Sequence, residues 1–312
     1  MKKVLITPRS FGKYNREELI EKLRQHGIEP VFNPYGTIMN EQQLRHALQD
    51  MDGLIVGVDP VSEEALKQAP KLKAIAKYGV GIDNIACAYA QENGIAVSRT
   101  VNANANAVAD YAMTLLMSVA RRVVEIDEGC HHNDWSKKEA LDIYGKTIGV
   151  LGLGAIGKGV VQRASGFDMR IYGYDIMRDD AFLNKYNVCF TDVDTIIREC
   201  DFISLHLPLT QETRHILNKE NLKHAKSNLI IVNTARGGLL DEDDLYELLK
   251  EKKLYGLGLD VFEQEPPQNS KLLTLPNCQL AYGCFLTRGD QCDESHGGGE
   301  SDSITGSIGD TV

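Results

Sequence analysis

The chain lacks the features that mark several classes of protein. No basic run is present, and the net charge over 312 residues is 34 − 44 = −10. This balance argues against nucleic acid or an anionic membrane as a main partner. No apolar run approaches the roughly 20 residues that a membrane-spanning helix needs, and the first residues, MKKVLIT, do not have the pattern of a signal peptide. We therefore expect a cytoplasmic protein.

Paired cysteine motifs are absent as well. The cysteines are scattered and none belongs to a C-x-x-C motif: Cys87, Cys130, Cys189, Cys200, Cys278, Cys284 and Cys292. Such spacing predicts neither a disulfide framework nor a metal site, and it fits a reducing compartment. The hydrophobic content of 43% and the charged content of 25% are typical of a globular protein. The length suffices for two domains.

The stretch from residue 146 to residue 175 carries the strongest signal. An apolar run leads into Gly152-x-Gly154-x-x-Gly157, a helical pattern follows, and a second apolar run ends in Asp175. The three glycines respectively permit a tight turn, close approach of a pyrophosphate, and close packing of helix on strand. The Asp175 carboxylate can accept both ribose hydroxyls of NAD and would repel the extra phosphate of NADP. The pattern predicts an NAD site.

Apolar runs alternate with helical patterns along most of the chain. In residues 1–99 this alternation predicts a parallel sheet covered by helices, a flavodoxin-like substrate domain. Residues 100–282 predict a six-stranded Rossmann NAD-binding domain, beginning with an apolar helix over 107–122 that we expect to be buried between domains or subunits. Residues 283–312, rich in Gly, Ser and Asp, predict a disordered tail. The expected fold class is α/β, with two doubly wound domains.

Local signals mark helix ends and one long connection. Asn15 precedes a helical pattern and has Glu18 three residues later, which is the spacing of a capping box. Asn40 is expected to cap the next helix. The polar segment 123–144 holds the only tryptophan, Trp135, and is long for a simple connection, which suggests an arm or a lid.

Three further motifs stand at the ends of predicted strands, where ligands bind in open α/β sheets. Residues 77–83 are KYGVGID, whose glycines leave backbone N–H groups available to an anionic carboxylate. Residues 232–238 are VNTARGG, in which Arg236 can grip a carboxylate or carbonyl bidentately. Residues 259–267 are LDVFEQEPP, an acidic loop beside two prolines.

With these motifs, residues 3–281 resemble the D-isomer-specific 2-hydroxyacid dehydrogenases, most of all short phosphoglycerate dehydrogenases without a C-terminal regulatory domain. The resemblance implies a cytoplasmic homodimer, formed through an arm over 100–145, that uses NAD. It implies oxidation of the CH–OH group of a D-2-hydroxy acid, 3-phosphoglycerate-like. Arg236 would bind the substrate carboxylate and carbonyl, and Glu265 would be the acid of a catalytic Glu–His pair.

The resemblance also implies two sets of binding residues and no metal ligands. The substrate is expected to contact Tyr78, Gly79, Val80 and Arg236. The cofactor is expected to contact Val80, Gly152, Gly154, Ala155, Ile156, Gly157, Asp175, His206, Leu207, Pro208, Thr234, Ala235, Arg236 and Asp260.

Simpler interpretations of several of these residues stay open. Arg236 could be a surface arginine, Glu265 a solvated side chain, and Asp260 a structural or nicotinamide-side residue. His206, in the sequence LHLP, invites an acid–base role, although in the family this strand end faces the nucleotide. Arg9, in the loop after the first strand, could meet a substrate phosphate or only solvent.

The chain departs from the family near its end. The family places its catalytic histidine shortly after the last Rossmann strand, and Gly283 stands at the matching position. The one later histidine is His296. The family also returns through a helix that completes the first domain, and we do not expect the tail to form it. Loss of the histidine predicts an impaired enzyme.

Two interpretations of this departure can be tested. The first is a frameshift, because residues 289–301, back-translated with freely chosen codons and read one base later, give an amphipathic helical sequence of the kind the family has here. Sequencing the gene around the codon for Leu280 tests it, and an unbroken frame in independent reads would remove it. The second is a non-catalytic NAD-binding sensor or partner-binding module, which an NADH oxidation assay distinguishes from a dehydrogenase.

Overall fold

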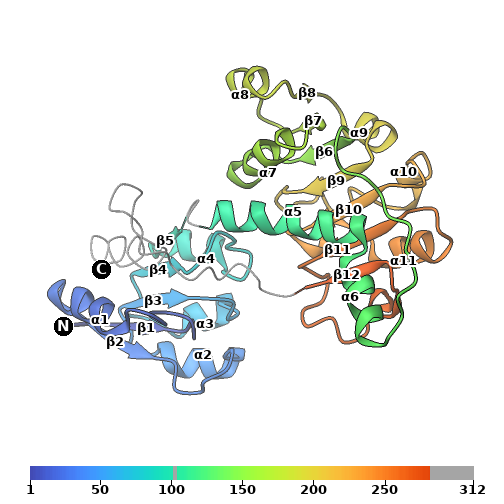
Figure 1. The fold of residues 1–312 in the computed structure, drawn as a ribbon. Helices are drawn as coiled ribbons and strands as arrows, with labels where there is room; N and C mark the ends of the chain where they lie inside the picture. Colours follow the sequence, from blue (N-terminus) through green and yellow to red (C-terminus); the bar gives the residue numbers. More distant parts are fainter. Residues whose placement is uncertain (101–103, 282–312) are drawn as a thin grey trace. The chain divides into compact units, whose positions relative to one another are not determined.

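The computed structural model describes residues 1–100 and 104–281. The predictions for the tail, for Gly283 and for His296 lie outside the described residues. The chain divides into two compact units, whose described parts are residues 1–100 and 104–281. Each unit is an α/β layer structure (Figure 1).

The first unit is a five-stranded parallel sheet between two helical layers. Its elements are β1 (Lys2–Ile6), α1 (Arg16–Gln25), β2 (Ile28–Phe32), α2 (Glu41–Leu48), β3 (Gly53–Val56), α3 (Glu63–Lys67), β4 (Ala74–Lys77), α4 (Cys87–Glu92) and β5 (Ala96–Arg99). The strand order β2-β1-β3-β4-β5 is that of a flavodoxin-like doubly wound sheet. Side chains of α1 fill the core on one face, and side chains of α2, α3 and α4 fill it on the other.

The second unit is a seven-stranded parallel sheet, also covered on both faces. Its elements are α5 (Ala105–Arg121), α6 (Val123–His131), β6 (Thr147–Leu151), α7 (Ala155–Ser165), β7 (Arg170–Tyr174), α8 (Asp180–Lys185), β8 (Cys189–Phe190), α9 (Val193–Glu199), β9 (Phe202–Leu205), α10 (Lys219–Leu222), β10 (Ile230–Asn233), the 3₁₀ turn η1 (Gly237–Leu239), α11 (Glu242–Lys250), β11 (Gly256–Leu259), the 3₁₀ turn η2 (Lys271–Thr274) and β12 (Cys278–Leu280). The order β12-β11-β10-β9-β6-β7-β8 contains the Rossmann arrangement, with the switch point between β6 and β9. The expected α/β fold class is confirmed.

Two expectations about the elements are wrong. The sheet of the second unit has seven strands rather than six, because the two- and three-residue strands β8 and β12 extend its edges. Strands this short carry no periodic pattern that a sequence reading can detect. The Asn15 side chain makes no capping hydrogen bond, because the residue has φ −141° and ψ 35° rather than an extended conformation. The Asn40 side chain does cap α2, through the backbone N–H of Gln43.

The long helix α5 packs within its own unit. It lies against α7, β10 and β11. Glycines allow the approach, because a Cβ built on Gly159 would lie 2.9 Å from Cβ of Ala109, and one on Gly256 would lie 2.5 Å from Cγ1 of Val119. This intimate packing explains why α5 is apolar over much of its circumference, and it anchors the strands that carry the candidate site.

The segment after α5 presents apolar side chains to solvent. Helix α6 has no buried residue, and Trp135 in the following segment is 77% exposed. The end of this segment is tied back to α5, because the Leu141 N–H donates to the Ala120 carbonyl at 2.9 Å. Arg121 Nη1 also donates to Asp142 Oδ1, at 2.9 Å. The end of segment 123–144 is thus fastened to α5, and the segment carries exposed apolar residues.

Candidate functional site

The glycine turn after β6 has the shape that the sequence pattern predicts. Gly152 has φ +99°, and a Cβ there would lie 2.6 Å from the backbone carbonyl of His206. A Cβ on Gly157 would lie 1.8 Å from the Gly152 oxygen. Around Gly154, by contrast, a Cβ would meet nothing within 4 Å. Gly152 and Gly157 are therefore required by packing, whereas Gly154 borders open space at the first turn of α7, where a phosphate can meet backbone N–H groups.

The Asp175 carboxylate is held against this glycine turn. Its Oδ2 accepts the backbone N–H of Leu153 at 2.6 Å, and its Oδ1 accepts the N–H of Met177 at 2.9 Å. Because an ionised carboxylate offers about four lone-pair sites, two such bonds leave acceptors for ribose hydroxyls. The acid and the glycine turn are one assembly, which sequence spacing could only suggest.

The register of the sheet aligns the remaining strand ends. Leu151 pairs with Tyr174 on one side and with Leu205 on the other, and Asn233 pairs with Leu205 and Leu259. The residues that follow these strand ends therefore lie along one edge of the sheet. They are Gly152, Asp175, His206, Thr234 and Asp260, all of which we assigned to the cofactor.

Two polar atoms on this edge are buried without a protein partner. They are Thr234 Oγ1 and His206 Nδ1, which have no hydrogen bond to any described residue. A buried polar group without a hydrogen bond costs about 1–3 kcal/mol, so a bound ligand is a natural source of the missing partners. Together with the space beside Gly154, these atoms show that the edge fits a dinucleotide.

The His206 ring is unsuited to acid–base work at neutral pH. Its Nε2 is 2.8 Å from Ser204 Oγ, and burial lowers the pKa of the imidazole to about 3. The residue as a whole is partly exposed, but Nδ1 is shielded from solvent. A ring that stays neutral well below pH 6 can exchange hydrogen bonds with a nucleotide but does not supply a proton. The acid–base interpretation of His206 is therefore disfavoured.

Arg236 lies in a turn that Asn233 organises. Asn233 is fully buried, its Nδ2 donates to the Arg236 carbonyl at 2.8 Å, and its Oδ1 accepts the Ala235 N–H at 3.0 Å. The Arg236 side chain is partly buried, and its Nη1 donates to the Ala235 carbonyl at 2.7 Å. The Arg236 guanidinium therefore lies close to the end of β10 and does not extend freely into solvent.

The acidic loop after β11 lies against the Arg236 turn. Its first residue, Asp260, is buried, and its N–H donates to the Asn233 carbonyl at 3.1 Å. A Cβ on Gly237 would lie 1.9 Å from the backbone of Phe262, so the two chain segments touch. The Glu265 carboxylate is exposed, and its Oε1 accepts the Phe262 N–H at 3.1 Å. That bond folds the loop and orients Glu265.

The substrate motif of the first unit is also at the end of a strand. Tyr78, Gly79 and Val80 follow β4 and are partly exposed, and Gly79 has φ +134°. Lys77 before them is buried, and its Nζ donates to the Gly57 carbonyl and to an Asn84 side chain. This network fixes the base of the loop, and the Tyr78 N–H joins it by donating to the Val56 carbonyl at 2.8 Å, so the Tyr78 N–H is not available to the substrate. The loop is therefore anchored at Lys77 and partly exposed beyond it, an arrangement that suits a site for a small anion.

Sequence reasoning missed several residues that build the site. Asn233 shapes the Arg236 turn, Ser204 holds the His206 ring, and Gly173 makes room for Leu153, since its Cβ would lie 2.9 Å from Leu153 Cδ1. Asn and Gly at or near strand ends are the available signal, because each is uncommon within strands. His215, which is considered below, had no signal in the sequence pattern.

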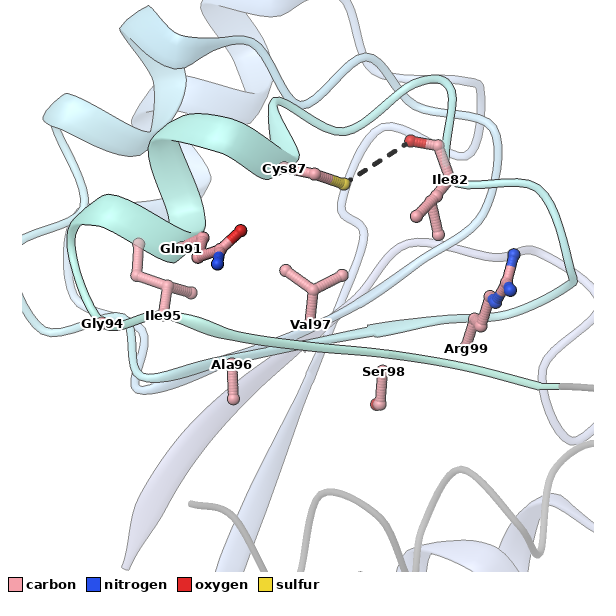
Figure 2. Close-up of a pocket in the computed structure, with 9 residues that line it drawn as sticks. All are labelled: Ile82, Cys87, Gln91, Gly94, Ile95, Ala96, Val97, Ser98 and Arg99. Atoms are coloured by element: carbon pink, nitrogen blue, oxygen red, sulfur yellow. Dashed lines mark hydrogen bonds between the residues drawn. The ribbon is translucent and has the colours of Figure 1, made fainter. Parts of the chain in front are cut away.

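A shallow pocket of about 620 Å³ lies elsewhere, along the edge strand β5. Figure 2 shows Cys87 and Gln91 of α4 on one side of it and Val97 of β5 on the other. The Cys87 thiol points to the Ile82 carbonyl at 3.9 Å. The pocket holds no residue assigned to substrate or cofactor and none of the unpartnered buried atoms, so we assign it no ligand.

Two surveys of the described residues gave negative findings. In residues 1–100 and 104–281, no helix has the length and apolar character required to cross a membrane. Within the same ranges, no group of three or more His, Cys, Asp or Glu side chains has an arrangement that would hold a metal ion.

Comparisons with known proteins agree with this geometry. A family model described as D-isomer specific 2-hydroxyacid dehydrogenase, NAD binding domain, matches residues 113–281. A glyoxylate reductase of Korarchaeum cryptofilum is 42% identical over 242 residues, which cover 75% of this chain and 73% of that protein. A D-3-phosphoglycerate dehydrogenase of Methanocaldococcus jannaschii is 40% identical over 265 residues, or 84% of this chain and 50% of that protein. A solved D-lactate dehydrogenase of Aquifex aeolicus, complexed with NAD and lactic acid, has a TM-score of 0.81 and 26% identity, covering 98% of this chain and 93% of that one.

Proposed function

Because the chain belongs to the family of D-isomer-specific 2-hydroxyacid dehydrogenases, we propose that it is built to transfer a hydride between NAD and C2 of a small D-2-hydroxy acid. The observation that carries this proposal is the sheet edge where the Asp175 carboxylate meets the glycine turn beside two unpartnered buried atoms. The relatives include a glyoxylate reductase, a hydroxypyruvate reductase and a D-3-phosphoglycerate dehydrogenase. A 3-phosphoglycerate-like acid remains our first candidate substrate.

Each predicted residue has a definite part in this proposal. NAD, when bound, supplies the hydride acceptor. The Gly154 backbone and the start of α7 would bind its pyrophosphate, Asp175 would bind the ribose, and Thr234 and His206 would complete their hydrogen bonds with it. Other residues that would line it are Ala155, Ile156, Leu207, Pro208, Ala235 and Asp260.

The substrate would be gripped by charge and by backbone dipoles. The Arg236 guanidinium would bind its carboxylate in two parallel hydrogen bonds and polarise the C2 carbonyl. In the first unit, the backbone N–H groups of Gly79 and Val80 are our further candidates for binding the substrate anion, whereas the Tyr78 N–H is already donated to the Val56 carbonyl at 2.8 Å. These contacts orient the reacting carbon, and orientation supplies a large part of the catalysis of such a step.

We further propose that this chain is impaired. Glu265 would raise the basicity of a catalytic histidine in the family, but the sequence has Gly283 at that position and no histidine between residues 225 and 281. The neutral His206 ring is no substitute. Loss of general acid–base catalysis costs a factor of about 10²–10⁴ in rate, so NAD binding would persist while turnover falls.

A second candidate function is favoured by the same observation. A protein that keeps the dinucleotide site and lacks the proton-transferring histidine can report the redox state of its cofactor without turning over substrate. In that case a partner protein would distinguish the NAD-bound form of the chain from the free form. The two candidates differ in turnover alone, not in NAD affinity.

An assay of NADH oxidation separates the two. The unaltered protein is mixed with NADH and glyoxylate, hydroxypyruvate or phosphohydroxypyruvate, and absorbance loss is followed over hours. Slow turnover of one acid, abolished in Arg236→Gln and retained in the exposed control Arg198→Gln, supports the impaired dehydrogenase. NADH binding with no turnover of any acid supports the sensor, and absence of NADH binding contradicts both.

We also propose a homodimer and a cytoplasmic location. Exposed apolar residues on the arm, described above, support the dimer. Among the described cysteines all five are free thiols, two of them buried, which fits a reducing compartment. Fractionation of the source cells tests the location, and recovery in an extracytoplasmic fraction would contradict it.

A further inference from the structure

Every polar group of His215 has a partner. Its N–H donates to the Gly238 carbonyl at 2.9 Å, and its carbonyl accepts from Asn218 Nδ2 at 2.8 Å. On the ring, Nε2 lies 2.6 Å from Glu263 Oε1, and Nδ1 lies 3.2 Å from Asp241 Oδ2. The residue also has φ +50°, a left-handed conformation that histidine adopts more readily than most side chains. Because all of these groups are bonded, the position of His215 relative to its neighbours is fixed.

The ring lies between two acidic side chains from different segments. Its Nε2 is hydrogen-bonded to Glu263, and its Nδ1 lies within ion-pair distance of Asp241. The three side chains are about one third exposed or less, so this bridge contributes little to global stability. Its evident effect is to fix the relative places of two segments.

The two bridged segments are those that carry the substrate-site residues. Gly238, which accepts the His215 N–H, belongs to η1 immediately after Arg236. Glu263 stands in the loop after β11, two residues before Glu265. The Glu263 N–H is itself held, by Glu242 Oε1 at 2.8 Å. His215 therefore reaches both segments from a third one, the loop between β9 and α10.

The segments are also in direct contact, so movement of one displaces the other. The backbone of Phe262 leaves no room for a Cβ at Gly237. If the bridge opened, the loop would lose one attachment beside η1, while the Asp260 N–H would still donate to Asn233 and the Glu263 N–H to Glu242. The separation of Arg236 and Glu265 would then be less tightly fixed.

We propose that His215 is a positioning residue of the 2-oxo acid site, whose contacts with Glu263 and Gly238 hold the Glu265 loop against the turn that bears Arg236. This inference rests on the proposed function. His215 itself touches neither the substrate nor the cofactor in this account, and it acts through Glu263 and Gly238.

The variant that tests this is His215→Asn. Asparagine tolerates the left-handed backbone conformation, and its side chain is too short to keep the contact that His215 Nε2 makes with Glu263. His224→Asn, at an exposed position of the same region, is the matched control. Three quantities are measured: hydrogen exchange of residues 236–240 and 260–266, affinity of the protein–NADH complex for oxamate by NADH fluorescence, and the affinity for NADH alone.

We expect faster exchange in both segments and about 10-fold weaker oxamate binding in His215→Asn, the scale of one lost charge-assisted hydrogen bond. NADH affinity and the melting temperature should match those of the control. The single variant Glu263→Gln should weaken oxamate binding similarly, and adding it to His215→Asn should cause no further loss, because both act on one bridge.

The contrary outcomes are separable. If the unaltered protein binds NADH but no oxamate, the proposed function fails and the positioning role fails with it. If it binds oxamate and His215→Asn binds it equally well, the positioning role alone is overturned, whether or not exchange changes. If NADH affinity falls in parallel with oxamate affinity, His215 is a general structural residue and the proposal is wrong.

Discussion

The carboxylate of Asp175 accepts the backbone N–H of Leu153, the middle residue between the first two glycines of the turn, at 2.6 Å. If Asp175 binds the ribose of NAD as we propose, coenzyme selection and the shape of the glycine turn are linked in this chain. A change at residue 175 alters a charge beside the ribose and also removes an acceptor from the turn. Both consequences lower affinity for NADH, but only the loss of charge favours NADPH.

Replacing Asp175 with Asn should shift coenzyme preference. One charge-assisted hydrogen bond is worth about 1.5–3 kcal/mol, so NADH affinity should fall by roughly 10–100-fold. NADPH affinity should fall less or rise, because the repulsion of its 2′-phosphate is removed. Fluorescence titration with both coenzymes measures this, with the exposed Asp194→Asn as control. An unchanged ratio of the two affinities would contradict the assignment of Asp175.

The glycines at positions 154 and 157 should respond oppositely to alanine. Gly154→Ala adds a Cβ into open space at an extended backbone conformation, so the fold should be unaffected while close approach of the pyrophosphate is blocked. NADH affinity should fall about 10-fold or more, as for one lost charge-assisted hydrogen bond. Gly157→Ala places its Cβ 1.8 Å from the Gly152 oxygen and should cost at least about 1–3 kcal/mol of stability.

Thermal unfolding and NADH titration of both variants provide the check. Each variant serves as the control of the other, since one is predicted to change binding and the other stability. A melting temperature that drops equally in both would show that the space beside Gly154 is not a ligand site.

Burial of His206 should make the folded protein sensitive to acid. An unfolded histidine has a pKa of about 6.5, and burial lowers that of His206 to about 3. Between these values the unfolded chain binds a proton that the folded chain does not, so the free energy of unfolding falls as the pH falls through this window. In His206→Gln this contribution is absent, and the variant should lose less stability between pH 7 and pH 5.

Urea denaturation at the two pH values, followed by circular dichroism, measures the difference. His224→Gln is the control, because His224 is exposed in the same unit. Equal losses of stability in the unaltered protein and in His206→Gln would mean that the folded protein protonates this ring readily. The acid–base interpretation of His206 would then have to be reopened.

Two kinds of feature are predicted best from the sequence. They are periodic patterns of strands and helices, and motifs whose residues together serve one known kind of binding site. Alternation of apolar runs and helical patterns indicates two doubly wound sheets, because each buried parallel strand needs helices on both faces. The spacing of Gly152, Gly154, Gly157 and Asp175 indicates the dinucleotide turn, since few other arrangements use those residues together. Asn40 with Gln43 indicates a cap, and the structure has it.

Features that depend on contacts between residues far apart in the sequence are not revealed by local patterns. The bridge of His215, Asp241 and Glu263 joins three separate loops, and no periodic pattern connects such positions. Asn15 is a residue type that often caps helices, but its backbone conformation here does not let the side chain reach the first N–H groups of α1. The short strands β8 and β12 exist because a neighbouring edge is available to pair with, which local propensity does not encode.

The exposed apolar face of α6 predicts the assembly state. Val123 and Val124 are 52% and 56% exposed, and Ile126 is 39% exposed. Apolar side chains clustered on a helix with no buried residue mark an interaction surface, and in a homodimer the same patch meets its own copy. Val124→Glu should therefore convert a dimer to a monomer, because an unpaired carboxylate would be buried at the contact.

Light scattering after size exclusion gives the mass of each form. Leu273→Glu is the matched control, since Leu273 is 47% exposed and belongs to η2 rather than to α6. We expect the control to keep the mass of the unaltered protein. A monomeric unaltered protein would contradict the dimer, whereas a dimeric Val124→Glu would move its contact away from α6. Because α6 follows directly on α5, which supports β10 and β11, dissociation should also weaken NADH binding.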